Sequence, residues 1–357
     1  MSSVSLRRLI GWMFACLVCA ALGVGVDRWT LSGRLLVERN PDDTLYYFLQ
    51  DVPPKPDEED AADRCLADYF STGNRAQLEK ANAHYKKIVP YAVGASWPAL
   101  AWMSEYLLLA PDRRAPFGES APELEALVAF HQRLKFSMLA STLGVQGFDD
   151  ATSQKEPTLP IVSRFTNETL HFLDPQRESW ERTTELIDRL ELKAGDHVAD
   201  IGCGPGYHVF RMAKRVGPTG RVHAVETSAA ALAFVRFIVE RQRVANVDLV
   251  KTGPSDITLP AASLDCALIC SLYHAIYGST SRAVREFFLG SVYRALKPGG
   301  RLVIVDNAPD GTADFRYFGN RIASRLVVSS VECYGFRCVR VINLAPQRYM
   351  VIFEKPR

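Results

Sequence analysis

Two carboxylates and a glycine-rich turn mark the part of the sequence best suited to binding a ligand. The run 198–206 reads VADIGCGPG, which predicts a buried strand, an acid at Asp200 and a tight turn into a helix. Its glycines alternate with other residues, at Gly202, Gly204 and Gly206. Glycine lets a backbone approach a ligand closely, and a helix start offers unpaired N–H groups. The next predicted strand, 222–225, ends at Glu226, whose carboxylate can accept hydrogen bonds from ribose hydroxyls.

The glycine spacing separates this turn from the turn of nicotinamide-binding folds. Those folds commonly use G-x-G-x-x-G and place a pyrophosphate on the helix N-terminus. Here the pattern is D-x-G-x-G-x-G, and Asp200 stands directly ahead of the turn. A negative charge there would repel a pyrophosphate and suits a cationic ligand. One such motif alone is weak evidence, but this one has the strand, helix and second strand that it needs.

Ligands of open α/β sheets bind outside the carboxyl ends of the strands, which selects further candidates. They are residues 200–206, Glu226, Asp256, residues 271–274 and residues 306–307. His274 is the best-placed base in this group, because a neutral imidazole can accept a proton near pH 7. Tyr273 is expected to orient an acceptor. Alternatively, His274 only shapes the rim of the pocket.

The segment from about residue 190 to residue 355 resembles a class I S-adenosylmethionine-dependent methyltransferase. Beyond the glycine turn and Glu226, three landmarks carry the resemblance. Residues 263–265 read as the family's entry into the apolar strand 264–270, and 296–306 contains an LKPGG turn followed by a strand. Residues 335–355 are typical of the closing antiparallel hairpin. About half of the chain is covered.

The resemblance implies a Rossmann-like seven-stranded sheet, mostly parallel with an antiparallel last strand, and S-adenosyl-L-methionine as the cofactor. Asp200 would hold the amino group of the cofactor, the three glycines would lie under its methionine arm, and Glu226 would bind the ribose. Ser271 joins the expected cofactor-binding set. Asp256 would lie near the adenine, although the family's Gly-Asp is here stretched to residues 253–256 with a proline inside. Alternatively, Asp256 caps a turn.

Methyl transfer from a sulfonium is an in-line displacement that leaves a neutral thioether, so alignment and exclusion of water matter most. A base is needed only when the acceptor is a hydroxyl or a protonated amine. Relatives with a second histidine beside the counterpart of His274 differ from this chain, which has Ala275. We therefore expect no metal.

Composition narrows the range of expected functions and partners further. The chain has 357 residues, of which 48% are hydrophobic, and a formal charge of +2. That balance gives no case for a nucleic-acid partner, and no motif typical of nucleic-acid methyltransferases follows the fourth strand. Eight scattered cysteines do not form a disulfide framework and suit a reducing compartment.

Residues 9–26 form an uncharged apolar run after Arg7 and Arg8. As a helix the run would be about 27 Å long, close to the ~30 Å thickness of the hydrocarbon layer. We expect a single-pass anchor in the inner membrane; a cleaved signal peptide is the alternative. Arginines flank both ends of the run, so the positive-inside rule barely decides the orientation. Because the cofactor is made in the cytoplasm, we expect the globular part to face it.

The expected organisation is therefore a transmembrane anchor at 1–30, a linker at 31–60, a helical domain at 61–150 and a methyltransferase domain at 151–357. The helical domain would either dock on the methyltransferase domain as a lid or substrate wall, or offer a surface to a membrane partner. The charge-dense segment 174–182 is similar to one in a group of bacterial methyltransferases, and its Arg177 or Trp180 could cover the ligand.

Two functions remain open. The first is a membrane-anchored methyltransferase acting on a small-molecule, lipid or quinone-like acceptor. The second is a non-catalytic subunit that keeps the fold as a scaffold in a membrane protein complex. The proline before Asp256 and the ambiguous orientation favour the second mildly.

Overall fold

The computed structural model describes residues 28–31, 35–39, 45–49, 56–90, 92–93, 95–110, 122–133, 168–279, 281–309, 316–317 and 321–357. The apolar run 9–26 and residues 134–167 lie outside these ranges. No helix within the described ranges is both long enough and apolar enough to cross a bilayer.

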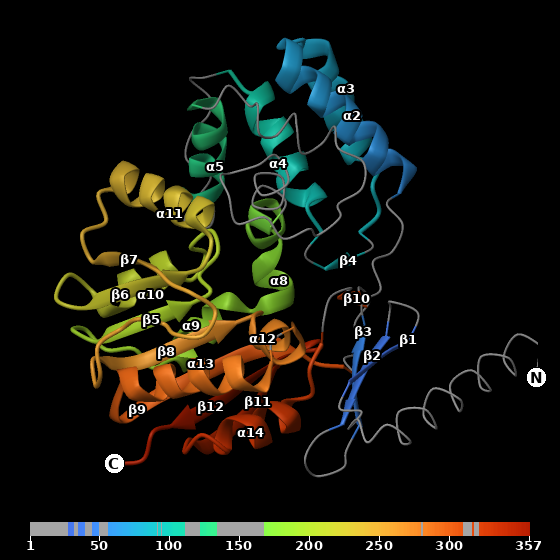
Figure 1. Cartoon of the computed structure of the whole chain (residues 1–357). Helices are drawn as coiled ribbons and strands as arrows, with labels where there is room; N and C mark the ends of the chain where they lie inside the picture. Colours follow the sequence, from blue (N-terminus) through green and yellow to red (C-terminus); the bar gives the residue numbers. More distant parts are fainter. Residues whose placement is uncertain are drawn as a thin grey trace, which may run out of the picture.

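A seven-stranded sheet dominates the C-terminal half, in the order β11-β12-β9-β8-β5-β6-β7 (Figure 1). Its strands are β5 (His197–Ile201), β6 (Arg221–Glu226), β7 (Val247–Lys251), β8 (Leu264–Cys270), β9 (Leu296–Asn307), β11 (Arg337–Ala345) and β12 (Arg348–Glu354). The five strands β5 to β9 pair in parallel, whereas β12 is antiparallel to both of its neighbours. The predicted sheet, including its antiparallel strand, is confirmed.

Helices cover both faces of this sheet. On one face α10 (Val209–Val216) and α11 (Ala229–Gln242) pack on β5 to β7; on the other, α13 (Arg282–Ala295) and α14 (Ser324–Glu332) pack on β9, β11 and β12. Strand β8 is apolar from Cys266 to Cys270, and its burial shows why. Cys266 and Leu268 belong to the core under α10 and α11, while Ala267 and Ile269 belong to the opposite core. Successive side chains point to opposite faces, so a strand buried on both faces needs apolar residues at every position.

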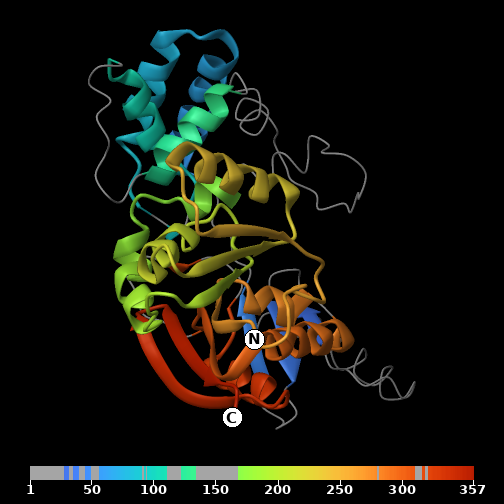
Figure 2. The same cartoon turned by 90° about the vertical axis from the view of Figure 1, so that its left-hand side faces the viewer.

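A block of helices lies at one end of the sheet, over α11 (Figure 2). It contains α2 (Asp57–Thr72), α3 (Arg75–Tyr85), α4 (Trp97–Leu108) and α5 (Pro122–Arg133). The contact with the sheet domain runs through α5. The ring of Phe130 meets Phe234 and Phe237 of α11 edge-on, with centroid distances of 5.3 and 5.6 Å. Of the two expected roles for the helical domain, docking on the sheet domain is the arrangement that the structure shows.

The segment expected to be a linker differs from its prediction. Within residues 31–60 and just before them, the backbone forms an antiparallel three-stranded sheet of β1 (Arg28–Leu31), β2 (Leu35–Arg39) and β3 (Leu45–Leu49). The acidic run 57–60 is the first turn of α2, so the helices begin at Asp57 and not at residue 61. Acids are stabilised there by the helix dipole, which explains why a charge-rich stretch is helical.

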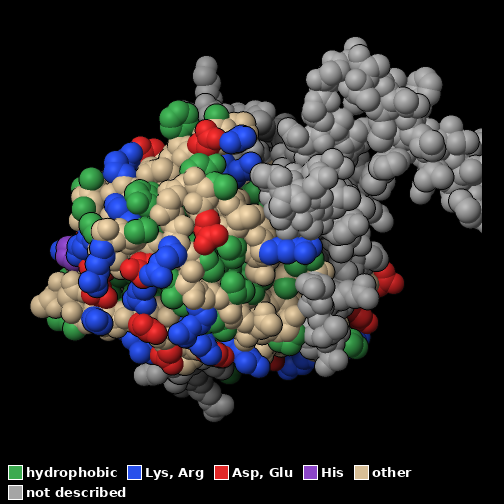
Figure 3. Space-filling view, turned by 90° about the horizontal axis from the view of Figure 1, so that it is seen from below, with side chains coloured by type: hydrophobic (Ala, Val, Ile, Leu, Met, Phe, Trp, Pro, Cys, Tyr) green, Lys and Arg blue, Asp and Glu red, His purple; other side chains and the backbone are tan. Residues whose placement is uncertain are grey.

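A short parallel bridge also links the helical block to the chain beyond β9. It pairs β4 (Ala92–Val93) with β10 (Arg316–Tyr317). The surface seen from below in Figure 3 mixes positive and negative side chains and shows no broad field of one sign.

Candidate active site

The glycine turn lies at the carboxyl end of β5, and its backbone explains its composition. Gly202, Gly204 and Gly206 all have positive φ, at 74°, 50° and 86°. Residues with a side chain rarely adopt this backbone conformation, so glycine is favoured at each position. At Gly202 a Cβ would also lie only 2.4 Å from Cδ2 of Leu272, whereas at Gly204 it would meet nothing within 4 Å. A side chain at Gly202 would therefore have to displace the end of Leu272, whereas Gly204 borders open space.

Asp200, at the end of β5, is buried at 2% exposure, and its Oδ2 is among the buried polar atoms without a hydrogen-bond partner in the described structure. Burial raises the pKa of Asp200 to about 7; the charge of Arg177 opposes this rise, and Glu226 and Glu181 add to it. An unpaired buried carboxylate oxygen is costly unless a ligand satisfies it. The amino group of an aminoacyl ligand has the right charge to do so.

Glu226 reaches back from the end of β6 to the glycine turn. Its Oε2 accepts a hydrogen bond from the Gly204 N–H at 3.0 Å, and its Oε1 accepts from the N–H groups of Thr227 and Ser228 at 2.6 and 2.8 Å. The carboxylate thus fixes the turn and caps the entry to α11. Because a carboxylate oxygen accepts more than one hydrogen bond, Oε2 can also take a ribose hydroxyl.

The carboxylate of Asp256 has partners of its own. It receives two hydrogen bonds from Arg294 in the last turn of α13, at 3.0 and 3.1 Å, and accepts from the N–H of Thr258. The geometry therefore favours the alternative expectation of a turn cap over a contact with the adenine.

His274 lies at the start of α12 (Tyr273–Ser279), just beyond β8, where Asp306 of β9 holds it. The backbone N–H of His274 donates to one carboxylate oxygen at 2.9 Å, and its Nδ1 lies 2.7 Å from the other. Although burial works to raise it, these contacts hold the pKa of Asp306 below its usual value. With Nδ1 facing an ionised carboxylate, the proton belongs on Nδ1, and Nε2 is the nitrogen that can accept a proton.

The expectation for Tyr273 is wrong. Its side chain is fully buried in the core, and its hydroxyl bonds to Oγ of Ser330 on α14 at 2.8 Å. Burial raises the pKa of this phenol. As α12 begins at Tyr273, consecutive residues point in different directions, so His274 faces the strand ends while Tyr273 packs away from them.

Ser271 lies at the strand ends as predicted, but its partner is a side chain. It has a positive φ of 53°, and its Oγ accepts a hydrogen bond from Arg348 of β12 at 2.8 Å. Ser271 is thereby part of a buried ion network that sequence reasoning missed.

The centre of that network is Glu181, at the end of α8 (Arg177–Glu181). Arg177 binds both of its carboxylate oxygens, at 2.8 and 2.9 Å, and Arg348 binds one at 2.8 Å. Burial alone would raise the pKa of Glu181, but Arg177, His208 and Arg348 hold it well below its usual value. The charge density of residues 174–182 was the only available signal, since Arg348 is distant in sequence.

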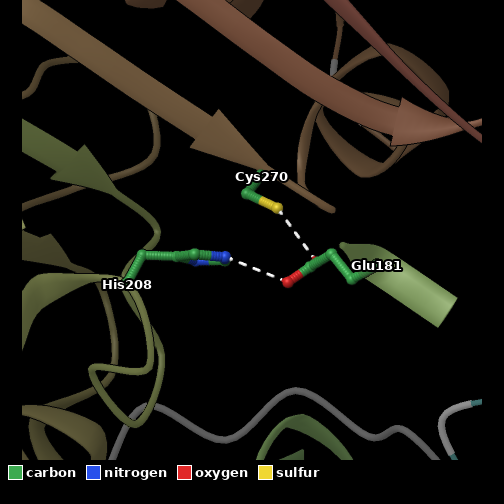
Figure 4. A group of neighbouring side chains, drawn as sticks. All are labelled: Glu181, His208 and Cys270. Atoms are coloured by element: carbon green, nitrogen blue, oxygen red, sulfur yellow. Dashed lines mark hydrogen bonds and ion pairs between the residues drawn. The ribbon is translucent and has the colours of Figure 1, made fainter. Parts of the chain in front are cut away.

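His208 and Cys270 complete the surroundings of Glu181 (Figure 4). The three ligand atoms lie within 4.8 Å of one another, which is a spacing that a metal ion could use. Burial lowers the pKa of His208 to about 4, although Glu181 opposes this. Two buried guanidinium groups already occupy the Glu181 carboxylate, and a divalent cation beside them would add strong repulsion. The group is better explained as an ion network than as a metal centre.

Comparison with known proteins places these features in a family. Residues 198–300, which include the glycine turn, Glu226 and His274, match the model of a methyltransferase domain. For these residues the expected class I S-adenosylmethionine-dependent methyltransferase domain is confirmed. The three further landmarks that suggested the resemblance lie in strands β8, β9, β11 and β12 of the sheet, and the expected LKPGG turn is the first part of β9.

Individual relatives share parts of their length with the chain. A transposon-encoded protein of Streptomyces fradiae is 33% identical over 122 residues, which are 33% of this chain and 32% of that protein. The uncharacterized methyltransferase YdaC of Bacillus subtilis is 28% identical over 169 residues, or 45% of this chain and 83% of YdaC. The ubiquinone/menaquinone biosynthesis C-methyltransferase of Pseudomonas fluorescens is 28% identical over 36% of this chain and 47% of its own length. The chain thus spans a third to a half of two of these relatives.

A solved methyltransferase of Aquifex aeolicus is 23% identical to the chain and has a TM-score of 0.47. The match covers 51% of this chain and 94% of the Aquifex chain.

Proposed function

We propose that the chain transfers a methyl group from S-adenosylmethionine to a small-molecule acceptor at the surface of the inner membrane. The observation that carries the proposal is the unpaired, buried Oδ2 of Asp200 beside a glycine turn that borders open space at Gly204. A protein that folds around an unsatisfied acceptor gains stability when a cationic ligand binds there.

Three residues fit the cofactor. Asp200 would receive its amino group, Gly204 would allow its close approach, and Oε2 of Glu226 would accept from a ribose hydroxyl. When bound, the cofactor supplies an electrophilic methyl group on a sulfonium. The protein's contribution is then to hold the acceptor in line and keep water away.

The acceptor class follows from His274 and Asp306. Asp306 fixes the proton on Nδ1, which leaves Nε2 of His274 to take a proton from an acceptor. Such a base serves a hydroxyl, a phenol or a protonated amine. A phenol also fits the relatives named for quinone biosynthesis, because removing its proton makes the adjacent ring carbon nucleophilic as well. An anchor at residues 9–26 would place the domain where hydrophobic phenols and lipids are found.

The first test is ligand binding by the full-length chain in mild detergent. Isothermal titration with S-adenosylhomocysteine should show saturable binding, and Gly204→Arg should abolish it by filling the open space. Lys193→Ala is a matched control on an exposed surface ahead of β5. If the wild-type chain shows no heat of binding at millimolar ligand, the proposal fails.

A second test addresses the base. With a phenolic acceptor, His274→Gln should lower kcat by about 10²- to 10⁴-fold while leaving the affinity for S-adenosylhomocysteine unchanged. If the affinity for S-adenosylhomocysteine and kcat fall by the same factor, His274 only shapes the rim of the pocket.

The location is testable in spheroplasts. A globular part that faces the cytoplasm should resist added protease until the membrane is broken. Digestion in intact spheroplasts would instead place it outside, away from the cofactor supply.

One observation favours the scaffold function. Leu272 packs against Gly202, and Oε1 of Glu226 is already taken by backbone donors, so part of the turn is filled by the protein itself. A full-length chain that copurifies at fixed ratio with a membrane complex, and does not bind S-adenosylhomocysteine, would establish that function.

A further inference from the structure

Arg211 of α10 joins the helical block to the glycine turn. Its Nη1 donates to Oε1 of Glu123 on α5 at 2.9 Å and to the backbone carbonyl of Tyr207 at 2.5 Å. One guanidinium nitrogen therefore contacts both a carboxylate of the helical block and the residue that follows Gly206. The link between the two regions is direct, since a single group makes both contacts.

Tyr207 is fixed from several sides. The guanidinium of Arg211 lies over its ring at 3.8 Å from the centroid, and that of Arg177 lies over it at 4.0 Å. Its hydroxyl lies 3.2 Å from Oγ1 of Thr183, which in turn donates to Glu181. Stacked guanidinium groups hold an aromatic ring in place. Tyr207 thus ties the end of the glycine turn to the buried network on one side and to Arg211 on the other.

The position of Arg211 depends on Glu123. The Glu123 side chain is only 5% exposed and that of Arg211 is 22% exposed, so water replaces this partner poorly. A pocket of about 390 Å³ borders Glu123, Tyr207 and Arg211. Close packing is therefore incomplete around this ion pair, which adds a polar link to the aromatic contact that Phe130 makes elsewhere on α5. Without the carboxylate, nothing described on α5 would hold the guanidinium over the ring.

The arginine of a second ion pair on α10 lines the same pocket, but this pair is far more exposed. Arg215, one turn further along, pairs with Asp188 of α9 (Thr183–Arg189), and their side chains are 49% and 53% exposed. No described contact joins this pair to the glycine turn. It offers a matched control on the same helix.

We propose that Glu123 is a positioning residue for cofactor binding: through Arg211 it fixes Tyr207 and with it the glycine turn. The helical block then sets the affinity of the methyltransferase domain for its cofactor. This inference rests on the proposed function, because it concerns the same cofactor site.

The test is the affinity for S-adenosylhomocysteine, measured by calorimetry on the full-length chain. Glu123→Gln keeps the size of the side chain and removes its charge; we expect about tenfold weaker binding, within the range of couplings between sites. Asp188→Asn should change the affinity less than twofold. With S-adenosylmethionine and an acceptor, Glu123→Gln should raise KM for the cofactor and leave kcat at saturation unchanged.

A double-mutant cycle separates positioning from a merely structural role. Arg211→Gln should weaken binding at least as much as Glu123→Gln, and the double variant should be no worse than Arg211→Gln alone. Effects that multiply, or an affinity of Glu123→Gln equal to wild type, would overturn the inference. If the wild-type chain does not bind S-adenosylhomocysteine, the proposed function itself fails, so the two failures are distinguishable.

Discussion

The two halves of the carboxyl edge of the sheet solve the problem of buried charge in opposite ways. Beside β8 and β12, Glu181 is surrounded by Arg177, Arg348, His208 and Thr183, and both of its oxygens are satisfied. Beside β5, Asp200 keeps an oxygen without a partner. Burial is almost complete for both acids. What differs is the source of the compensating charge: the protein supplies it to Glu181, whereas under the proposed function a ligand would supply it to Asp200.

The largest expected effect on stability comes from removing the charge of Glu181. Glu181→Gln leaves two buried guanidinium groups without their anion and should lower the free energy of unfolding by about 3–5 kcal/mol. Urea denaturation measures this loss. Glu191→Gln, whose side chain is 72% exposed and pairs with Arg301, should stay within about 0.5 kcal/mol of wild type. A mild effect of Glu181→Gln would mean that the network is not what holds these elements together.

Removing the charge of Asp200 should change the stability in the opposite direction. The pKa of Asp200 is raised from 3.8 to about 7 in the folded protein, so its contribution to stability is present below pH 4 and is lost as the pH rises to 7. That difference corresponds to roughly 4 kcal/mol at most. Asp200→Asn should therefore be more stable than the wild type above pH 7, and the gap should close toward pH 4. Denaturation of both proteins in urea from pH 4 to pH 8 measures the gap; a variant less stable than wild type at pH 8 would contradict it.

Ligand affinity sharpens the same contrast. A cationic amino group binds the ionised form of Asp200, so S-adenosylhomocysteine should bind about tenfold more weakly for each pH unit below 7. Above pH 7 the affinity should level off. Asp200→Asn should bind weakly at every pH. Calorimetric titrations between pH 5.5 and pH 8 decide this, and a pH-independent wild-type affinity would remove Asp200 from the site.

The smallest effect tests the correction for Tyr273. Tyr273→Phe removes one buried hydrogen bond to Ser330 and should cost about 1 kcal/mol of stability. Because the ring lies in the core, kcat and cofactor affinity should remain within about twofold of wild type. A large loss of rate with unchanged stability would return Tyr273 to the reaction.

Local signals made the sheet and one part of the site predictable. Strand β8 was expected at its observed bounds because its apolar run and flanking turns are contiguous in sequence. Asp200, the glycines and Glu226 were found because one turn and two adjacent strands bring them together. Asp306 was placed at the strand ends by topology, but its contact with His274 depends on how α12 begins.

The remainder depends on contacts that no local pattern reports. Glu181 meets Arg348 across the whole domain, and Glu123 meets Arg211 from another domain. The first turn of α2 was taken for a solvated linker because its acids and prolines resemble one. Tyr273 was assigned by adjacency to His274, which fails in a helix because neighbouring residues face different ways.

The bond from Arg348 to Glu181 also has a consequence for biosynthesis. The two residues are separated by 167 positions, and Arg348 opens the last strand of the sheet. A ribosome must therefore release nearly all of the described chain before the acid of α8 meets its second cation. Until then Glu181 is paired with Arg177 of its own helix, and the contact that joins α8 to the last strand forms only after that strand has been synthesised.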